Sequence, residues 1–322
     1  MDKVIIHKGT YLRRRAVIMD NGTLSLAFLP AFGFKMASLF YKPTGFESLF
    51  QPATQSYKKP TPDACFEKYD TSGCDDMLPT IDACAYPGSE YQGARLPDHG
   101  EVWARSWSVS ISDYSVKGTV ELDCLPMRFT RTVSFESEHT VRFDYIARNL
   151  GAKPLRFLWA LHPLNMLKKG TRLLLPKGSR KLLNVHQGSA PDYAEKEIDF
   201  GSSGLSAPYA IGHGHSCKYY VNNPLNIGCA GLYYPQDKLA LLYRFDPVKL
   251  PYLGVWINTG GFKNEVNIAI EPSNGFYDSL ERAVSNNTAV AILPDKDVRW
   301  SLKIDLKPAS LKELSGDFDY LK

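Results

Sequence analysis

Three short segments of the sequence carry residue types that could perform acid–base chemistry. The first contains His99, in the run LPDHGE; the second is an apolar run that reaches His162; the third is an apolar run that reaches Glu271. A carboxylate with one or two histidines is a sufficient set for proton transfer near neutral pH. Taken singly, His162 also fits a buried core histidine, and Glu271 also fits a carboxylate paired with a lysine at the rim of the fold.

The residues around these candidates predict where they lie on the elements of the fold. Pro163 follows His162 and cannot continue a hydrogen-bonded ladder, so we expect His162 at the end of a strand, facing a cleft lined by loops. Glu271 follows the apolar run Asn-Ile-Ala-Ile and precedes the turn-forming run Pro-Ser-Asn-Gly. We therefore expect Glu271 at a strand end as well.

Hydrophobic periodicity over most of the chain has period two, which indicates half-buried strands. The clearest case is residues 299–306, where Trp300, Leu302 and Ile304 alternate with Ser301 and Lys303. Further strands are expected at residues 23–29, 119–123, 130–135, 141–146, 155–161, 238–244, 253–258 and 266–270. Only residues 46–50 and 310–314 suggest short helical turns. Strands separated by frequent turn signals predict an all-β fold, a large antiparallel sandwich or barrel.

Composition and charge narrow the class of protein. The chain has 322 residues, of which 44% are apolar and 22% charged, with a net charge of +4. No break in composition divides it, so we interpret residues 1–322 as a single domain. The basic clusters are short, which argues against nucleic-acid binding, and no apolar run reaches the ~18 residues of a membrane span. No secretory signal is visible, and six cysteines in such a chain are expected to be reduced thiols, so we predict a soluble, cytoplasmic protein. Oligomeric state is left open.

Several common sites are missing from the sequence. It contains no phosphate-binding loop, no dinucleotide-binding glycine motif, no zinc-protease motif and no nucleophile elbow. His213, His215 and Cys217 form the one compact group of metal-ligand types, and a fourth ligand is not evident. We interpret them as surface loop residues and predict neither a metal nor a cofactor.

The three segments, in this order, resemble the galactose mutarotase-like family, which includes aldose 1-epimerases and hexose-phosphate epimerases. The resemblance covers nearly the whole chain, from a first hairpin near residues 21–39 to last strands near 293–302. Its motifs are Gly73 to Pro79, His99-Gly100 with Trp107, His162-Pro163 with Asn165, and Glu271-Pro272.

The resemblance implies a β-supersandwich with a sugar site in an open cleft on one sheet face. Carried over, Glu271 would be the general base, His162 the general acid, and His99 would bind or polarise the sugar. The activity implied is aldose 1-epimerisation, in which the sugar ring opens, rotates about C1–C2 and closes on the other face without a cofactor. The remaining candidates for sugar binding are Asp76, Arg105, Asn165, Trp159, Asp246 and Trp256. A bell-shaped pH profile follows from these roles, with Glu271 protonating at low pH and His162 losing its proton at high pH.

The sequence also departs from the family. In the phosphate-handling branch an arginine closely follows His-Gly, whereas here that position is Trp103 and the arginine is Arg105. We therefore expect a free aldose rather than a sugar phosphate. Two alternatives stay open: a carbohydrate-binding or sensing protein without catalysis, and a glycoside-cleaving enzyme that pairs Glu271 with Asp76 or Asp246. For Asp246, a turn-forming role is the simpler interpretation.

Overall fold

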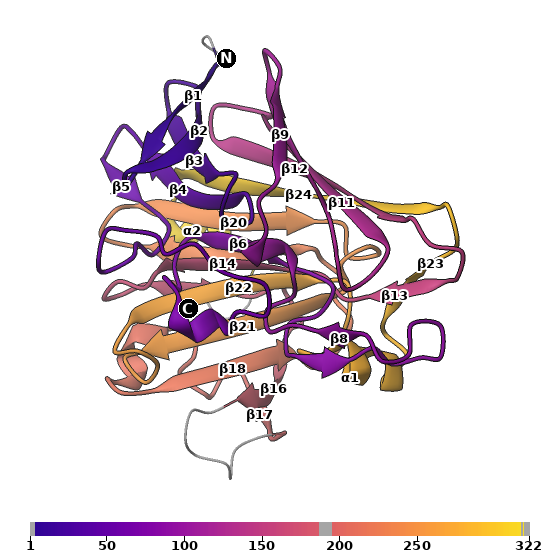
Figure 1. Cartoon of the computed structure of the whole chain (residues 1–322). Coiled ribbons are helices and arrows are strands. Elements are labelled where there is room, and N and C mark those ends of the chain that lie inside the picture. Colours follow the sequence, from indigo (N-terminus) through magenta and orange to yellow (C-terminus); the bar gives the residue numbers. More distant parts are fainter. Residues whose placement is uncertain (1–3, 187–194, 317, 319–322) are drawn as a thin grey trace.

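The computed structural model describes residues 4–186, 195–316 and 318, and most of them form antiparallel strands (Figure 1). Within these residues, a 12-stranded sheet runs in the order β1-β2-β3-β4-β6-β14-β22-β21-β18-β16-β17, with β5 paired to β4. Its strands are β1 (Ile5–Tyr11), β2 (Arg14–Asp20), β3 (Leu24–Leu29), β4 (Lys35–Tyr41), β5 (Phe46–Glu47), β6 (Cys74–Met77), β14 (Ala160–Met166), β16 (Lys181–His186), β17 (Glu197–Asp199), β18 (Ser216–Val221), β21 (Tyr252–Thr259) and β22 (Val266–Ser273).

A second sheet in the described residues has 8 strands, in the order β15-β19-β20-β24-β12-β11-β10-β9. These are β9 (Ser108–Ile111), β10 (Ser115–Glu121), β11 (Met127–Phe135), β12 (Thr140–Asn149), β15 (Arg172–Leu174), β19 (Cys229–Tyr234), β20 (Leu239–Phe245) and β24 (Asp297–Pro308). Two short pairs complete the described strands: β13 (Leu155–Phe157) with β23 (Val290–Ile292), and β7 (Cys84–Ala85) with β8 (Arg95–Leu96). The predicted all-β antiparallel sandwich is confirmed.

Helices are short and stand at turns. Helix α1 (Leu280–Ser285) begins at Ser279, whose side chain accepts a hydrogen bond from the third helical N–H. Helix α2 (Leu311–Leu314) has a capping box between Ser310 and Glu313, and it confirms the predicted turn at 310–314. The other predicted helical turn, at 46–50, is wrong because β5 occupies its start. Single 3₁₀ turns are η1 (Phe66–Lys68), η2 (Val102–Ala104) and η4 (Pro208–Ile211).

The predicted strand at 155–161 is in fact two strands, and neither His162 nor Glu271 stands at a strand end. Strand β14 pairs with β22 through Ala160 opposite Ser273 and again from Leu164 opposite Ala269, so the ladder is interrupted around Pro163 and then resumes. On its other side β14 keeps its pairing with β6 through Pro163 itself. The proline therefore removes one donor without ending the strand, and both candidate residues come from the middle of the sheet.

The core fills the space between the two large sheets. Its largest cluster of buried apolar residues runs from Val17 in β2 to Leu306 in β24. The side chains of Tyr145, Trp159 and Trp300 pack together there with ring centroids 4.9–5.4 Å apart. The opposite face of the 12-stranded sheet is covered by the parts of the chain between β5 and β9 that flank β6, drawn in violet in front of β14, β22 and β21 in Figure 1.

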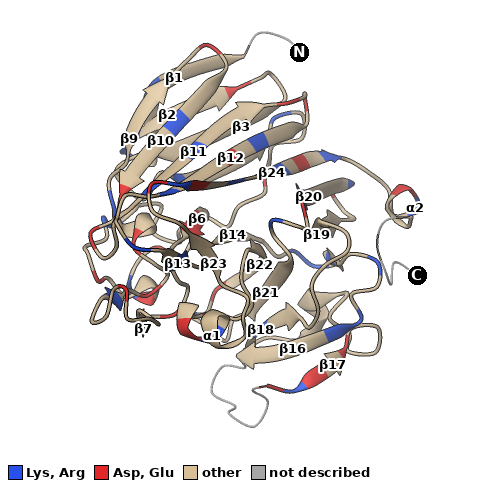
Figure 2. Cartoon of the chain, turned by 90° about the vertical axis from the view of Figure 1, so that its right-hand side faces the viewer, with Lys and Arg blue, Asp and Glu red and all other residues tan. Residues whose placement is uncertain are grey.

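Charged residues are interspersed rather than gathered by sign, and in Figure 2 acidic and basic segments alternate over both sheets and their loops. Among the described residues, none of the helices has the length and apolar character needed to cross a membrane.

Candidate functional site

Strand register brings Glu271 and His162 side by side on the covered face of the 12-stranded sheet. Because Ala160 lies opposite Ser273 and Leu164 opposite Ala269, His162 falls opposite Glu271. The same row continues to Asp75 on β6 at one side and to Gly254 on β21 at the other. Side chains opposite each other on neighbouring strands share a face, so this row places an imidazole beside a carboxylate.

Glu271 is buried, with a residue exposure of 1%. Its Oε2 lies 2.7 Å from Lys218 Nζ, and its Oε1 lies 3.9 Å from His162 Nε2. Oε1 accepts no hydrogen bond from the residues that the structure describes. Burial raises the pKa of the Glu271 carboxyl above its ordinary value, while the charge of Lys218 opposes the rise. The site thus holds a buried carboxylate with one oxygen that has no hydrogen-bond partner among the described residues.

His162 is buried at the same place, and its environment keeps the ring neutral. Burial, together with the positive charges of His99, Lys218 and Lys35, lowers the pKa of His162 well below its ordinary value. The expectation that His162 loses a proton at high pH therefore fails for the free protein, because the ring has already lost that proton near neutrality. Its Nε2 can still form a hydrogen bond to a sugar oxygen.

His99 reaches the site from a loop and is held there by its neighbours. The residue adopts φ 58°, a left-handed conformation that is rare outside glycine and strained by roughly 1–3 kcal/mol. Asp98 Oδ1 lies 2.8 Å from His99 Nδ1, and the ring stacks on Phe66 with centroids 4.1 Å apart. Although burial alone would raise it, the hydrogen bond and charge of His99 lower the pKa of Asp98. The pair leaves His99 Nε2 available to a ligand.

The position after His99 requires a glycine, Gly100. It has φ 73°, and a Cβ at this position would meet the Leu78 carbonyl oxygen at 2.3 Å. The Glu101 amide donates to that same carbonyl at 2.8 Å. The chain can therefore pass close beside β6 and present His99 only if residue 100 lacks a side chain.

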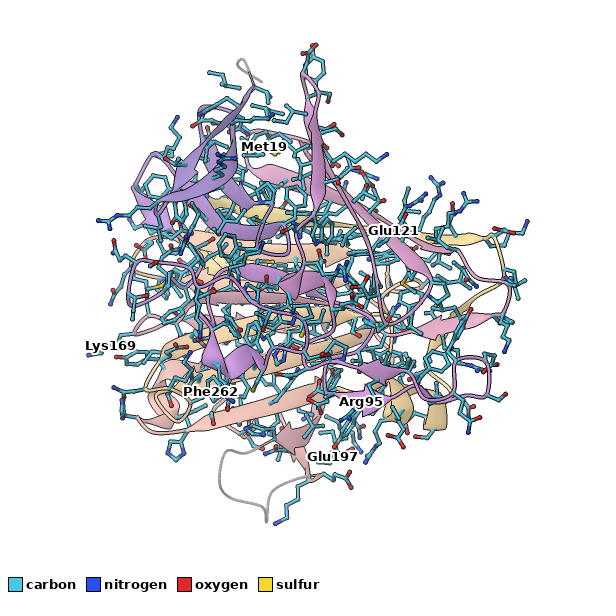
Figure 3. All side chains as sticks on the ribbon, in the orientation of Figure 1. Met19, Arg95, Glu121, Lys169, Glu197 and Phe262 are labelled. Atoms are coloured by element: carbon cyan, nitrogen blue, oxygen red, sulfur yellow. The ribbon has the colours of Figure 1, made fainter. Side chains whose placement is uncertain are left out.

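These residues line one cavity of about 370 Å³, a volume within the usual range for small-molecule sites. Four aromatic residues form much of its apolar wall: Phe66, the half-buried Trp256, Tyr277, and Phe262 from the turn between β21 and β22, which is labelled in Figure 3. The Trp256 indole N–H donates to Asn267 Oδ1 at 3.1 Å, which fixes the ring. The charged residues that line the cavity are Lys218 and, in greater number, the acidic residues Glu67, Asp82, Asp98, Glu265, Glu271 and Asp278.

Of the nine site residues predicted from the sequence, four line this cavity: His99, His162, Trp256 and Glu271. Two others, Asp76 and Trp159, lie in the core between the sheets with 0% exposure. Asp76 forms an ion pair with Arg131 at 2.8 Å and accepts the Trp159 indole N–H at 3.0 Å. Asp76 follows Asp75 on β6 and so points to the opposite face of the sheet, where sugar has no access.

The remaining three candidates also serve the fold. Asn165 lies three residues beyond His162, faces the interior, and accepts a hydrogen bond from the Tyr243 hydroxyl at 2.8 Å. Arg105 is held by ion pairs to Glu101, at 2.5 Å, and to Asp123. Asp246 is exposed in the turn after β20, where its carboxylate accepts the Val248 amide at 2.9 Å. None of the three lines the cavity, and we do not retain them as sugar ligands.

Sequence reasoning missed the groups that complete the site. Lys218 sits in the middle of the buried strand SCKYYV, and a lysine in so apolar a run was a usable signal. Asp278 lies in an irregular segment and Phe66 in the single 3₁₀ turn η1, and the position of both depends on tertiary contacts, so the sequence offered no comparable signal for them. Within the described part of the chain, His213, His215 and Cys217 belong to no group of three side chains that could hold a metal ion.

Solved structures share this arrangement of strands. A galactose mutarotase-like protein from Lactobacillus casei is 16% identical, with a TM-score of 0.70 over 91% of this chain and 100% of the other. A galactose mutarotase-like protein from Clostridium acetobutylicum is 13% identical, with a TM-score of 0.70 over 95% and 99%. A galactose mutarotase related enzyme from Lactobacillus acidophilus is 14% identical, with a TM-score of 0.63 over 95% and 100%. The chain has the galactose mutarotase-like fold.

Sequence comparison adds no closer relative: no family model matches the chain, and no curated protein matches it. At these identities the likeness establishes the galactose mutarotase-like fold alone. What the cavity does must be argued from its own residues.

Proposed function

We propose that the protein is an aldose 1-epimerase-like enzyme that interconverts the α and β anomers of a free sugar. The observation that supports this is the meeting of three groups in one cavity: the buried Glu271 with a free Oε1, His162 Nε2 at 3.9 Å from it, and His99 held by Asp98. Anomer interconversion needs a base at the C1 hydroxyl and a proton donor at the ring oxygen, and this set supplies both.

Glu271 Oε1 would take the proton from the C1 hydroxyl. As that O–H bond breaks, C1 forms a carbonyl, the bond from C1 to the ring oxygen breaks, and the ring oxygen receives a proton. The open aldehyde rotates about C1–C2, and the same steps in reverse close the ring on its other face. The proton gained by Glu271 and the proton lost by the donor are returned on closure, so the cycle needs no other reactant.

We assign the proton at the ring oxygen to His99 rather than to His162. His162 is neutral near pH 7 because it is buried among positive charges, so its Nε2 serves as a hydrogen-bonding group. His99 has a carboxylate partner at Nδ1, the arrangement that orients an imidazole for proton transfer through Nε2.

The charge of the cavity favours a free aldose over a sugar phosphate. Among the described residues that line it there is no arginine, and the one lysine already lies between two carboxylates, Glu271 and Asp278. A phosphate would meet an excess of negative charge here and no bidentate partner. The Trp256 face offers an apolar surface of the kind that stacks on a sugar ring.

Neither alternative is favoured by an observation of this structure. The carboxylate pair of a glycoside-cleaving enzyme is not formed with Asp76 or Asp246, because both lie outside the cavity. A binding protein without catalysis would keep the same cavity, and it is therefore an outcome of the experiment below. All six cysteines are free thiols, which supports a cytoplasmic location as part of this proposal.

Polarimetry of freshly dissolved α-glucose and α-galactose tests the function. We expect the protein to accelerate mutarotation of at least one aldose, and Glu271→Gln to reduce the rate by about 10²–10⁴-fold. Glu121→Gln, an exposed carboxylate labelled in Figure 3, is the matched control and should retain full activity. His99→Gln removes the assigned proton donor and should lower the rate more than His162→Gln does.

The corresponding 6-phosphates, followed in the same way, should be poor substrates. Saturable sugar binding by calorimetry with no acceleration would identify a binding protein and refute the enzymatic proposal. Acceleration that survives Glu271→Gln would refute the assigned base.

A further inference from the structure

Lys218 is buried in the middle of β18, and its charge must be compensated there. The residue is 7% exposed and lies between Cys217 and Tyr219 in a strand whose residues are all buried. A lysine ammonium in such a place costs several kcal/mol unless it is paired with opposite charge. The identity of its partners therefore indicates what the residue is for.

Two carboxylates hold the ammonium, one from each side. Nζ lies 2.7 Å from Glu271 Oε2 and 2.8 Å from Asp278 Oδ1. Asp278 is itself fixed, because its Oδ1 accepts the Tyr220 hydroxyl at 2.7 Å. The Asp278 backbone carbonyl also accepts the amides of Ile81 and Asp82, at 3.0 and 2.6 Å. The lysine thus stands between the catalytic carboxylate and an anchored second one.

Space for this assembly is provided by Gly254 on the intervening strand β21. A Cβ at that position would lie 3.3 Å from Glu271 Oε2 and 3.5 Å from the Tyr220 ring. The glycine lets Lys218 reach past β21 to a residue two strands away, which a larger side chain would hinder.

We propose that Lys218 is a positioning residue for Glu271: it binds Oε2, holds the carboxylate in its charged form, and leaves Oε1 as the only oxygen that can accept the sugar proton. Asp278 and Tyr220 hold the lysine in turn. This inference rests on the proposed function, since it assigns the working oxygen of the proposed base.

Among the charged and titratable groups around Glu271, Lys218 does most to favour the charged form of the carboxylate. They are His162 on β14, Lys218 and Tyr220 on β18, His99 after β8, Asp278 after β22, and Asp82 before β7. Lys218 has a carboxylate at 2.7 Å, and its two acidic neighbours outweigh burial and raise its pKa, so it stays charged. A protonated lysine cannot serve as a nucleophile toward the aldehyde. Without it, burial and Asp278 would both favour the protonated form of Glu271.

The test compares the pH dependence of kcat and kcat/KM in three variants. Lys218→Met should lower kcat near pH 7 about tenfold or more and move the acid limb up by at least about one pH unit. Lys218→Arg keeps the charge and should leave the acid limb within about half a unit of the wild type. Lys168→Met is the matched control, since Lys168 pairs with Asp237 at 2.6 Å outside the cavity, and it should change neither quantity.

A readout independent of activity separates this inference from the proposed function. In protein labelled with [δ-¹³C]glutamate, the Glu271 carboxyl resonance is the one absent from Glu271→Gln, and its titration gives the pKa directly. We expect that titration to move to higher pH in Lys218→Met and in Lys218→Gln, which is made alongside it in case one of the two does not fold.

If neither the wild type nor any variant accelerates mutarotation, the proposed function is refuted. The titration of the Glu271 carboxyl resonance would still decide the role of Lys218. An unmoved titration, or a rise in KM alone with the acid limb unchanged, would overturn the inference and identify Lys218 as a sugar ligand. A shift of the acid limb in Lys218→Arg by more than about one unit would overturn it as well, even if neither neutral variant folds.

Discussion

Two buried ion pairs of nearly the same composition belong to the two faces of the 12-stranded sheet. Asp76 pairs with Arg131 at 2.8 Å on the inner face, and Glu271 pairs with Lys218 at 2.7 Å on the covered outer face. Side-chain exposure is 0% for both partners of the first pair, and 1% and 9% for Glu271 and Lys218. Burial and pairing therefore do not distinguish a carboxylate in the core from one at the candidate site.

The two carboxylates differ in how many of their oxygens have a polar partner. Asp76 receives Arg131 on Oδ2 and the Trp159 indole on Oδ1, and the guanidinium lies 4.5 Å from the centre of the Phe34 ring. Glu271 has Lys218 beside Oε2, whereas its Oε1 accepts no hydrogen bond from the described residues and lies 3.9 Å from His162 Nε2. The Asp76–Arg131 pair, called the closed pair below, has a partner on each carboxylate oxygen and joins the two sheets. The Glu271–Lys218 pair leaves one oxygen without a hydrogen bond, and that oxygen can take a proton from a ligand.

Removing one partner of the closed pair should give the largest loss of stability. Asp76→Asn leaves the Arg131 charge buried and uncompensated, which lowers the free energy of unfolding by about 3–5 kcal/mol. Urea denaturation followed by tryptophan fluorescence measures this. Glu271→Gln should cost less, because Lys218 keeps Asp278.

The exposed pair of Glu121 with Arg128 provides the control for this comparison. Glu121→Gln should change the free energy of unfolding by less than about 1 kcal/mol. At a temperature where the Asp76→Asn variant remains folded, that variant should keep whatever mutarotation rate the wild type shows. Equal stability losses in Asp76→Asn and Glu121→Gln would contradict the comparison.

Sequence patterns predicted the fold class, and they named four of the residues that line the candidate site. Alternation such as that of Trp300, Leu302 and Ile304 reports a strand directly, because side chains on a strand point alternately to its two faces. The pairing of β14 with β6 and β22 joins segments far apart in the chain, and period-two patterns do not report register. The interpretation of residues 1–322 as one domain stays a prediction.

The same alternation could have corrected several site predictions. His162 and Asn165 are three residues apart on one strand, so only one of them can face the cavity, and the same reasoning separates Asp75 from Asp76. Trp256 faces the cavity because it pairs with Ala269, two residues from Glu271. That fact required the register and was out of reach of the sequence.

On the covered outer face of the 12-stranded sheet, His162 should also make the stability of the protein depend on pH. The pKa of His162 is lower in the folded protein than the ~6.5 of an exposed histidine, so the unfolded chain binds the proton more readily. Its contribution to stability is present above about pH 6.5 and is lost as the pH falls below it. Between pH 7.5 and 5, we expect wild type to lose about 1–2 kcal/mol relative to His162→Gln.

Urea denaturation of both proteins at the two pH values measures this difference. His7→Gln, at an exposed position on β1, is the matched control. A wild type that keeps the same difference from His162→Gln at both pH values would show that the imidazole is not held neutral by its surroundings.

The smallest effect is expected at Asp246, which lies in the other sheet's loops, away from both ion pairs. Its carboxylate accepts one amide in an exposed turn, at 2.9 Å, and makes no contact with the cavity. Asp246→Ala should change the free energy of unfolding by about 0.5 kcal/mol and leave KM for the aldose unchanged. Because Asp246 was also a predicted sugar ligand, the KM of this variant separates the two interpretations. A several-fold rise in KM with unaltered stability would restore Asp246 to the site and would mean that the sugar extends well beyond the cavity around Glu271.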